Sequence, residues 1–495
     1  VLQMLFNSFN FIIYFLIVVT LYYILPYKAG IYMLLAASYI FYMWWNPALI
    51  FIIVFVTFIN FALAAAIYKK HDKVYKKRYL ILAVLLNFGI LFFFKYLTFA
   101  CGSVNSLAQY LGSSWRVMVP DIVLPMGISF YTFQAAAYTI DVYRERLKPS
   151  KSYVKFSLFI TFFPQLVAGP IERSKNLLGQ FNHKNRFKME NVLSGLEIML
   201  IGYFKKVVIA DRLSVAVNTV FNNCTAYGGL YYIVAVIMFT IQIYCDFSGY
   251  SGIARGAARV LGFKLMINFN TPFAAKSIRE YWRRWHISLS SWFMDYVYIP
   301  LGGNRKGRLI KYRNLMITFL VSGLWHGANW TFVIWGALHG AMLVIEDILR
   351  TEIKKFKRMY NIHTGIIFDI TRGILATLIT FGLVAFAFIL FRANTISDAG
   401  YILSHIFWDF RKWFTAQYLY ELFTNIGLTL YELKVVAIAV AVLLLSEGLC
   451  GGPNVSVVMR KRGIVVEVLY FAFILLFILT AGVFYNAGEF IYFQF

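Results

Sequence analysis

Long apolar runs separated by short basic clusters organise the first hundred residues of the chain. The runs cover about residues 5–25, 30–45, 49–68 and 79–100, and each is close to the length of a membrane-spanning helix. Residues 69–78, between the third and fourth runs, contain six basic residues and one acidic residue. Because cytoplasmic loops are enriched in Lys and Arg, we expect this loop inside and the N-terminus outside.

The central part of the chain alternates spans with interrupted segments. Residues 124–146 predict a helix that returns to the cytoplasm. Prolines and a glycine interrupt residues 156–173, so we expect a broken or re-entrant segment that lines a cavity. Residues 191–221 fit one helix or two shorter ones. Residues 231–247 predict a span, and the small-residue segment at 245–265 predicts a re-entrant or interfacial helix.

An uncharged run from residue 314 to residue 344 follows Arg313 and precedes the basic residues 350–358. Both of its ends therefore face the cytoplasm in this interpretation. We expect the run to double back, with a turn near Trp330 or Gly336.

The last part of the chain predicts three further spans, at 365–390, 435–445 and 464–485, and an amphipathic segment on the outer face at 398–432. The C-terminus is expected outside. The pattern as a whole predicts an all-α polytopic membrane protein with about eleven transmembrane helices plus re-entrant and interfacial helices. We expect one membrane-embedded domain over residues 1–495, made of N-terminal helices (1–120), a catalytic core (121–346) and C-terminal helices (347–495).

Composition supports the membrane class. Of the 495 residues, 60% are hydrophobic and only 14% are charged, which is outside the range of ordinary soluble domains. The formal net charge of +25 does not indicate nucleic acid, because the basic residues sit in clusters between apolar runs. We interpret them as topology signals and as contacts for anionic membrane lipids.

The four cysteines lie far apart without a CxxC pair, so we expect no metal and no redox centre. The first apolar run lacks a basic leader and a small-residue cleavage site. We therefore expect it to be a retained helix, with the native start at Met4.

The stretch from Tyr281 to Gly340 holds the strongest candidate chemistry. It presents His286 between arginines and serines, then a basic hairpin at 305–313, then His326 inside the uncharged run. A titratable ring roughly 20 Å along a membrane helix is costly, and such residues are functional candidates by default. The alternative for His326 is a packing histidine hydrogen-bonded between helices. Neighbouring small residues allow close helix approach or a bend; they are Ser322, Gly323 and Gly327.

Two chemistries fit these residues. A buried neutral imidazole can take a proton from a hydroxyl, which would activate an alcohol to attack a thioester. The competing class is a membrane transporter, with His326 and Asp246 as proton or substrate sites. Asp246 can also be a helix cap or an ion-pair partner of Arg255. The remaining histidines are expected to have no chemical role, and His339 would face away from His326 on one continuous helix.

Several motifs carry a resemblance to a known family. WHISLSSWFMDYVYIPLGGNR at 285–305 and SGLWHGANWTFVIWGALHG at 322–340 resemble the signature of the membrane-bound O-acyltransferase superfamily. FFPQLVAGPIER at 162–173, QIYCDFSGYSGIARG at 242–256 and FILFRANTISDAG at 388–400 resemble its bacterial alginate O-acetylation branch. The resemblance to the teichoic acid D-alanyl transferases is weaker.

The resemblance implies roles for individual residues. His326 matches the membrane-embedded histidine taken as the catalytic base, and His286 matches a second histidine that positions or polarises the acyl carbonyl. It also implies a central tunnel, with the acyl donor entering from the cytosol and the acceptor from outside. The candidate substrate-binding residues are Trp282, Arg283, Ser290, Asp295, Asn304, Arg305, Trp325, Asn329 and Asp246. Donor phosphates are expected near Arg283, Arg284, Arg305 and Lys306.

These implications give one leading function. We expect a multi-pass enzyme of the bacterial inner membrane that moves an acetyl group from a cytosolic thioester, such as acetyl-CoA, to an extracellular or cell-wall polysaccharide. No bound cofactor is expected. The expected partners are the acyl donor, an extracellular O-acetyltransferase of the SGNH type or another type, the polysaccharide and membrane lipids, with no nucleic acid. D-Alanyl transfer to teichoic acid and transport remain the alternatives.

Overall fold

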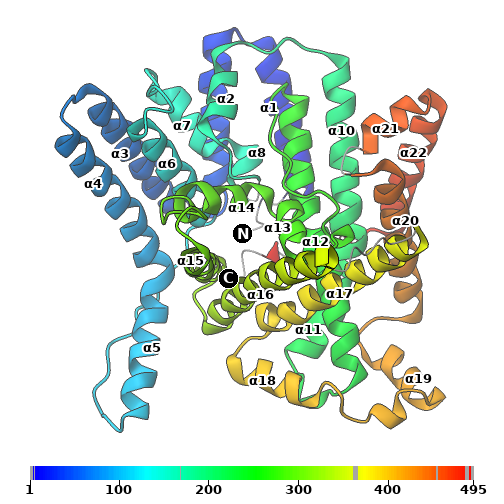
Figure 1. Cartoon of the computed structure of the whole chain (residues 1–495). Coiled ribbons are helices and arrows are strands. Elements are labelled where there is room, and N and C mark those ends of the chain that lie inside the picture. The colour runs from blue at the N-terminus through cyan, green and yellow to red at the C-terminus, as the bar shows by residue number, and fades with distance from the viewer. Residues whose placement is uncertain are drawn as a thin grey trace. The chain divides into compact units, whose positions relative to one another are not determined.

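The computed structural model describes residue 4 and residues 6–167, 169–359, 366–452, 455–484 and 490–491. His363 and the predicted outer C-terminal residues 492–495 lie outside these ranges. The described chain is helical and contains no strand, which confirms the predicted all-α class. Figure 1 labels the helices in chain order.

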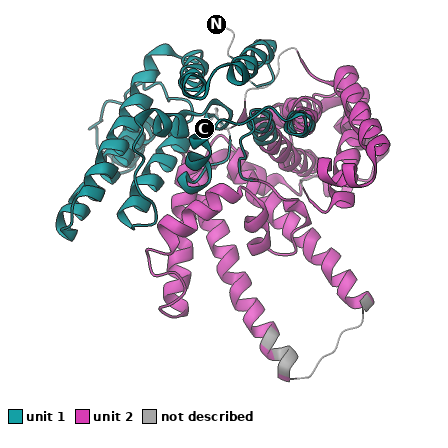
Figure 2. Ribbon diagram, turned by 90° about the horizontal axis from the view of Figure 1, so that it is seen from above, with its two compact units in different colours: residues 1–199, 250–266 teal, residues 200–249, 267–495 magenta. Residues whose placement is uncertain are grey.

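The chain divides into two compact units, coloured separately in Figure 2. Unit 1 comprises residues 1–199 and 250–266, and unit 2 comprises residues 200–249 and 267–495. Two helices, α10 and α12, contribute residues to both units. The single domain over residues 1–495 expected from the sequence remains a prediction.

Unit 1 is built from apolar helices whose buried faces carry large aromatic side chains such as Phe11 and Phe156. Its helices are α1 (Phe9–Ile24), α2 (Tyr27–Met43), α3 (Ile50–Lys69), α4 (Lys73–Leu91), α5 (Leu97–Tyr110), α6 (Ile128–Tyr143), α7 (Tyr153–Thr161), α8 (Phe163–Leu166), α9 (Ser174–Leu177) and most of α10 (Met189–Tyr203). The break predicted in residues 156–173 is confirmed, because α7 and α8 are short and no helix is described between Leu166 and Ser174. Pro164 stands in the first turn of α8, where its missing N–H costs nothing.

Unit 2 carries the candidate chemistry. Its helices are α11 (Asp211–Phe221), the first part of α12 (Leu230–Val260), α13 (Ile278–Arg284), α14 (Ile287–Phe293), α15 (Arg308–His326), α16 (Trp330–Met359), α17 (Ile366–Arg392), α18 (Ile396–His405), α19 (Ala416–Asn425), α20 (Leu430–Cys450), α21 (Val455–Lys461) and α22 (Ile464–Ala481). Residues 314–345 double back as predicted. The turn occupies Gly327–Asn329, beside Trp330 and not at Gly336.

Three predicted boundaries are wrong because helices continue through polar or small residues. The fourth apolar run, predicted to end near residue 100, continues to Tyr110 through a π-helical segment, η2 (Phe92–Tyr96). Residues 230–260 form the single helix α12, so the separate interfacial helix expected at 245–265 does not exist. The expected hairpin at 305–313 is shortened, since α15 begins at Arg308.

Residues 189–221 form one continuous helical segment in which the π-helical turn η4 (Phe204–Ala210) joins α10 to α11. Within the described chain, seven helices are long and apolar enough to cross a membrane, and α1 is a shorter apolar helix. The chain is therefore a multi-pass membrane protein. The expected total of about eleven includes shorter and more polar segments, and the sidedness of each loop stays a prediction.

Candidate active site

His326 ends helix α15, directly before the turn to α16. The two helices approach closely at glycines: a Cβ on Gly323 would overlap the carbonyl of Phe332, and a Cβ on Gly336 would overlap the carbonyl of Phe319. Small residues allow helix backbones to approach in a membrane protein without losing dispersion contacts. His326 is 2% exposed at this tight hairpin. The close packing predicted from Gly323 and Gly327 is confirmed for Gly323, and Gly327 lies against the ring of Phe332.

His286 lies between α13 and α14 in a left-handed backbone conformation, with φ +44° and ψ +54°. A residue with a Cβ adopts this conformation at a cost of about 1–2 kcal/mol, and such strain clusters at functional sites. The backbone N–H of Ile287 donates to the carbonyl of Asn268, 2.9 Å away, which holds the turn in place. The strained turn points the His286 imidazole into the interior, where it is fully buried.

Asn268 sets the tautomer of His286. Its Oδ1 accepts from the backbone N–H of Ser288 (3.2 Å) and from the Ser288 hydroxyl (2.9 Å), and it lies 3.2 Å from His286 Nδ1. We therefore assign the proton of neutral His286 to Nδ1, which leaves the lone pair on Nε2. His286 lies outside the seven candidate spans. Burial lowers the pKa of its imidazole to about 3, so the ring is neutral at physiological pH.

The two imidazoles lie in one aromatic enclosure. Their ring centroids are 6.5 Å apart, a separation that one small substrate group can bridge. Trp325 contacts both rings, with centroids 5.8 Å from His286 and 5.0 Å from His326. The enclosure is completed by Phe247 and Phe269 around His286 and by Trp335 and Phe391 around His326. These apolar walls exclude water, which strengthens any electrostatic interaction inside them.

His339 was expected to face away from His326, and the structure corrects this. The reasoning assumed one continuous helix, whereas the turn at Gly327–Asn329 folds α16 back along α15. Trp335 stands between the two histidines, with centroids 4.9 Å from His326 and 4.7 Å from His339. The indole N–H of Trp282 donates to His339 Nδ1 over 3.3 Å. The predicted residue Trp282 is thus connected to the enclosure through a histidine that the sequence argument set aside.

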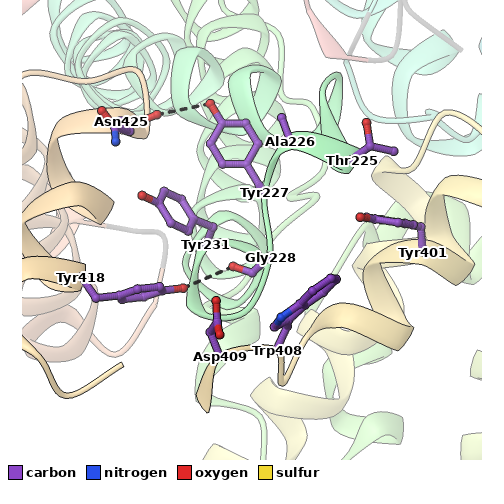
Figure 3. A pocket seen from close by; sticks show the side chains of 10 residues that line it. All are labelled: Thr225, Ala226, Tyr227, Gly228, Tyr231, Tyr401, Trp408, Asp409, Tyr418 and Asn425. Carbon is purple, nitrogen blue, oxygen red and sulfur yellow. Dashed lines mark hydrogen bonds between the residues drawn. The ribbon is translucent and has the colours of Figure 1, made fainter. Parts of the chain in front are cut away.

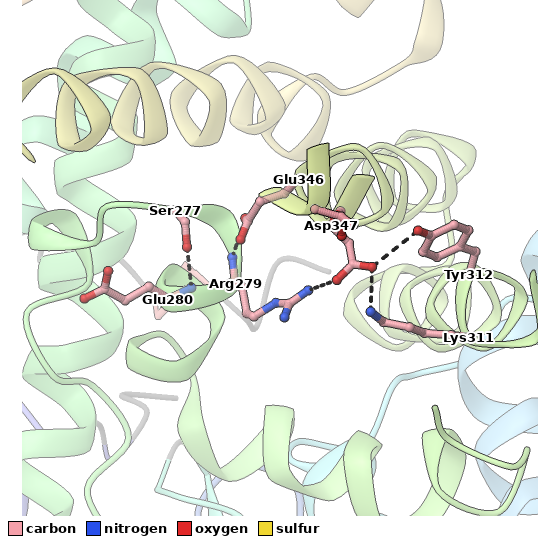
Figure 4. Close-up of polar contacts among 8 residues, drawn as sticks. Ser277, Arg279, Glu280, Lys311, Tyr312, Glu346 and Asp347 are labelled. Atoms are coloured by element: carbon pink, nitrogen blue, oxygen red, sulfur yellow. Dashed lines mark hydrogen bonds and ion pairs between the residues drawn. The ribbon is translucent and has the colours of Figure 1, made fainter. Parts of the chain in front are cut away.

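A half-buried acidic side chain ties α13, α15 and α16 together (Figure 4). Asp347 on α16 lies 2.7 Å from Arg279 Nη2 and 2.6 Å from Lys311 Nζ, and the hydroxyl of Tyr312 donates to it over 3.3 Å. The neighbouring Glu346 accepts from the backbone N–H of Arg279 at the start of α13. This network fixes the helix that precedes His286 against the hairpin that carries His326.

The other predicted substrate-binding residues separate into two groups. Arg283, Asn304 and Arg305 are exposed, whereas the two imidazoles are buried. Ser290 donates to the nearby carbonyl of Trp285, whereas Asn329 donates to the carbonyl of Asn394, 65 residues further along the chain.

Three further residues were predicted to lie near the substrates: Asp295 as a substrate-binding residue, and Arg284 and Lys306 near the donor phosphates. Asp295 is half-buried in the π-helical turn η7 (Met294–Tyr298). Arg284 pairs with Glu280 over 2.8 Å, whereas Lys306 is exposed. Within the described ranges, no group of three or more His, Cys, Asp or Glu side chains is close enough to hold a metal ion.

Asp246 belongs to a different cluster. It lies inside α12, not at a helix end, and its Oδ1 is 2.6 Å from Lys206 Nζ. The same ammonium lies 2.8 Å from Asp211, and the backbone N–H of Ile491 donates to Asp246 Oδ2. The helix cap and the ion pair with Arg255 expected as alternatives are therefore replaced by a buried pair with Lys206. A substrate-binding role for Asp246 stays a prediction.

Comparison with known proteins identifies the family. The model of the membrane-bound O-acyltransferase (MBOAT) family matches residues 37–380. The chain is 41% identical over 351 residues to a probable alginate O-acetylase of Azotobacter vinelandii, covering 70% of each chain. It is 38% identical over 396 residues to a peptidoglycan O-acetyltransferase of Helicobacter pylori, covering 74% of this chain and 71% of the relative.

A more distant relative is the teichoic acid D-alanyltransferase of Bacillus subtilis, which is 28% identical over 318 residues and matches 59% of this chain. The matched region contains both imidazoles, the Asn268 contact and the α15–α16 hairpin. This chain belongs to the membrane-bound O-acyltransferase family and is an acyltransferase.

Proposed function

We propose that this enzyme moves an acetyl group from a cytosolic thioester, such as acetyl-CoA, across the membrane for O-acetylation of an extracellular or cell-wall polysaccharide. The observation that carries the proposal is the pair of buried imidazoles 6.5 Å apart in an aromatic enclosure. The similarity to alginate and peptidoglycan O-acetylating relatives supports acetyl as the group transferred and a polysaccharide as its destination.

In the proposed reaction His326 is the general base. Its imidazole takes the proton of the acceptor hydroxyl while the hydroxyl oxygen attacks the thioester carbonyl carbon. The tetrahedral intermediate then collapses, the carbon–sulfur bond breaks, and the imidazolium returns its proton to the leaving thiolate. The products are an O-acetyl ester and a free thiol, so no oxidant, metal or covalent enzyme intermediate is needed.

His286 positions the reacting groups in this proposal. With its proton on Nδ1 and directed at Asn268, it presents a lone pair at Nε2. The one proton of the attacking hydroxyl goes to His326, so the lone pair of His286 can orient only another O–H or N–H of the bound substrates, whereas polarising an acyl carbonyl would require an N–H donor. Of the two roles that the resemblance implied, the hydrogen bonding therefore favours positioning.

Two alternatives from the sequence can be weighed. Transport is disfavoured because the chain is an acyltransferase, and because Asp246, one of the two groups that transport would use, is held by Lys206. D-Alanyl transfer is supported only by the more distant relatives. The extracellular partner that completes transfer to the polymer is part of the proposal, and it follows from the resemblance to the alginate system.

Donor selection tests the proposal. Purified enzyme in lipid nanodiscs is incubated with radiolabelled acetyl-CoA or, separately, with a D-alanyl carrier protein, and release of free thiol is followed. We expect thiol release from acetyl-CoA that depends on His326, with His71→Ala as a control because His71 is exposed. Release from the D-alanyl carrier alone would replace acetyl transfer with D-alanyl transfer.

A further inference from the structure

A second pocket lies in unit 2, away from the histidine enclosure. It has a volume of about 360 Å³, which falls within the range of ligand-binding pockets. Its lining combines four tyrosines and a tryptophan with polar groups: Tyr227, Tyr231, Tyr401, Trp408, Tyr418, Asp409, Asn425 and Thr225, together with Ala226 and Gly228. Figure 3 shows Tyr401 and Trp408 on one side of the pocket and the other three tyrosines opposite.

Two rings that line one wall of the pocket are joined by a third ring, His405, which does not itself line the pocket. Tyr401 stacks on His405 with centroids 4.0 Å apart, and His405 stacks on Trp408 at 4.6 Å. Trp408 remains 54% exposed although one side of its indole is covered by His405. The wall therefore presents a flat aromatic surface to the pocket without requiring a rearrangement.

The opposite wall is held in place by backbone contacts. The hydroxyl of Tyr227 donates to the carbonyl of Asn425, and that of Tyr418 donates to the carbonyl of Gly228 (Figure 3). Gly229 has φ +56°, and a Cβ there would overlap the carbonyl of Trp408, so this glycine lets the two walls meet. The pocket is thus a preformed feature of the fold.

The charges and aromatic faces of the lining indicate which class of ligand the pocket can bind. Among the described residues that line the pocket, Asp409 alone carries a charge, and it is paired with Lys412 over 3.0 Å. A phosphate or an anionic lipid head group would find no cation in this lining. Flat aromatic faces suit the C–H surface of a pyranose ring, while Asp409 and the tyrosine hydroxyls suit its hydroxyl groups.

The pocket is connected to the catalytic hairpin. Phe391, which contacts His326, is in the last turn of α17, and α18 begins at Ile396 and carries Tyr401. Asn329, in the turn after His326, donates to the carbonyl of Asn394 between these two helices. The wall of the pocket therefore continues from the segment that encloses His326.

We propose that this pocket binds a non-ionic pyranose unit of the polysaccharide that receives the acetyl group, so that the enzyme itself holds the polymer. The inference rests on the proposed function, since it names the acceptor class. Trp408 would stack on the sugar ring, and Asp409 would accept hydrogen bonds from its hydroxyls. The pocket lies on the segment expected at the outer face, where a polymer would arrive.

Saturation-transfer NMR with purified full-length protein in nanodiscs tests the inference, with cellohexaose as the neutral probe and hexamannuronate as the anionic probe. We expect cellohexaose binding with the strongest saturation at the axial C–H protons that face Trp408. Trp408→Ala is expected to weaken binding about tenfold or more, and Asp409→Asn is expected to weaken it less. Phe414→Ala is the matched control, because Phe414 is 77% exposed in the same segment and does not line the pocket.

The outcomes separate this inference from the proposed function. His326→Ala should lose thioester cleavage and keep cellohexaose binding. The inference is overturned if cellohexaose does not bind at about 10 mM, if Trp408→Ala binds it like Phe414→Ala, or if only hexamannuronate binds. In each of those cases His326-dependent cleavage of acetyl-CoA would still support the proposed function.

Discussion

At the scale of single residues, the hydrogen bonds of Asn268 determine which nitrogen of His286 carries the proton. Because Ser288 donates twice to Asn268 Oδ1, this oxygen is fixed as an acceptor, and His286 must turn its Nδ1–H toward it. Neutral His286 is then left with its lone pair on Nε2, as the proposed positioning role requires. Nothing in the sequence singled out Asn268, since its partners are 18 and 20 residues away along a stretch without helical periodicity.

Asn268→Ala should reduce the rate of thioester cleavage by about 10–100-fold, the usual effect of removing a side chain that orients a functional histidine. Asn268→Asp should retain more activity, because the acceptor oxygen is kept. Its carboxylate would favour the imidazolium form, so the acid limb of the pH–rate profile should move to higher pH. Equal losses in both variants with unchanged pH profiles would contradict an orienting role.

The low pKa of His286 predicts a pH dependence of stability. The folded imidazole titrates near pH 3 and the unfolded one near 6.5, so the unfolded state binds more protons between these values. The contribution of His286 to the free energy of unfolding should therefore be fully present above about pH 6.5 and fall as the pH is lowered through this window. Thermal unfolding of wild type and His286→Gln between pH 4.5 and 7.5 measures it, and parallel curves would contradict the shift.

At the scale of elements, the sequence largely predicted the α15–α16 hairpin, but it did not predict which side chains the hairpin brings together. The absence of charges over residues 314–344 and the basic residues at both ends indicated a segment that doubles back. The position of the turn was ambiguous between Trp330 and Gly336, because both small and aromatic residues recur through the run. Because the position of the turn was not predicted, the place of His339 was not predicted either. The turn at Gly327–Asn329 brings His339 beside Trp335.

Gly323→Ala should destabilise the hairpin by about 1–3 kcal/mol, the usual cost of overpacking, because the new methyl group meets the backbone carbonyl of Phe332. Gly382→Ala in α17 is the matched control. Nothing lies within 4 Å of a Cβ at that position, so helix propensity alone acts and the change should be neutral or stabilising by up to about 1 kcal/mol. Thermal unfolding of both variants in the same detergent measures the difference in their stability, and equal unfolding midpoints would contradict the close packing at Gly323.

The π-helical turn η4 explains a second failure of sequence reasoning. Charged residues such as Lys206 and Asp211 are mostly exposed in proteins, whereas the structure buries both and pairs Lys206 with Asp246 on α12. Asp246 lies 40 residues beyond Lys206, so the sequence near Lys206 and Asp211 gives no sign of their third partner. Burial is tolerated here because each carboxylate shares the ammonium group.

Lys206→Met should destabilise the protein by about 3–5 kcal/mol, because two buried carboxylates lose their counter-ion. Lys355→Met removes an exposed pair with Glu352 and should cost at most about 1 kcal/mol. Adding Asp246→Asn to Lys206→Met should recover part of the loss. Unfolding midpoints of the four proteins would contradict the account if Lys206→Met and Lys355→Met behaved alike.

At the scale of the whole molecule, the sequence predicted the all-α membrane class and the family, but only some of the residues of the buried site. Hydropathy identified the helices because every backbone group in a bilayer must be satisfied within the segment. The signature residues around His286 and His326 identified the family. The sequence could not identify the aromatic residues that enclose the two histidines, because an aromatic wall has the same sequence pattern as any apolar helix face or loop. These residues include Trp335, Phe391 and Phe269.

The central claim is that two neutral imidazoles in a dry enclosure perform acyl transfer. Thioester cleavage by purified His326→Ala, His286→Ala and the double variant, with His71→Ala as control, tests it most directly. Groups that act as a unit are non-additive, so we predict that His326→Ala loses at least about 100-fold in rate and that the double variant is little worse. Wild-type turnover in His326→Ala, with the protein folded, would contradict the account.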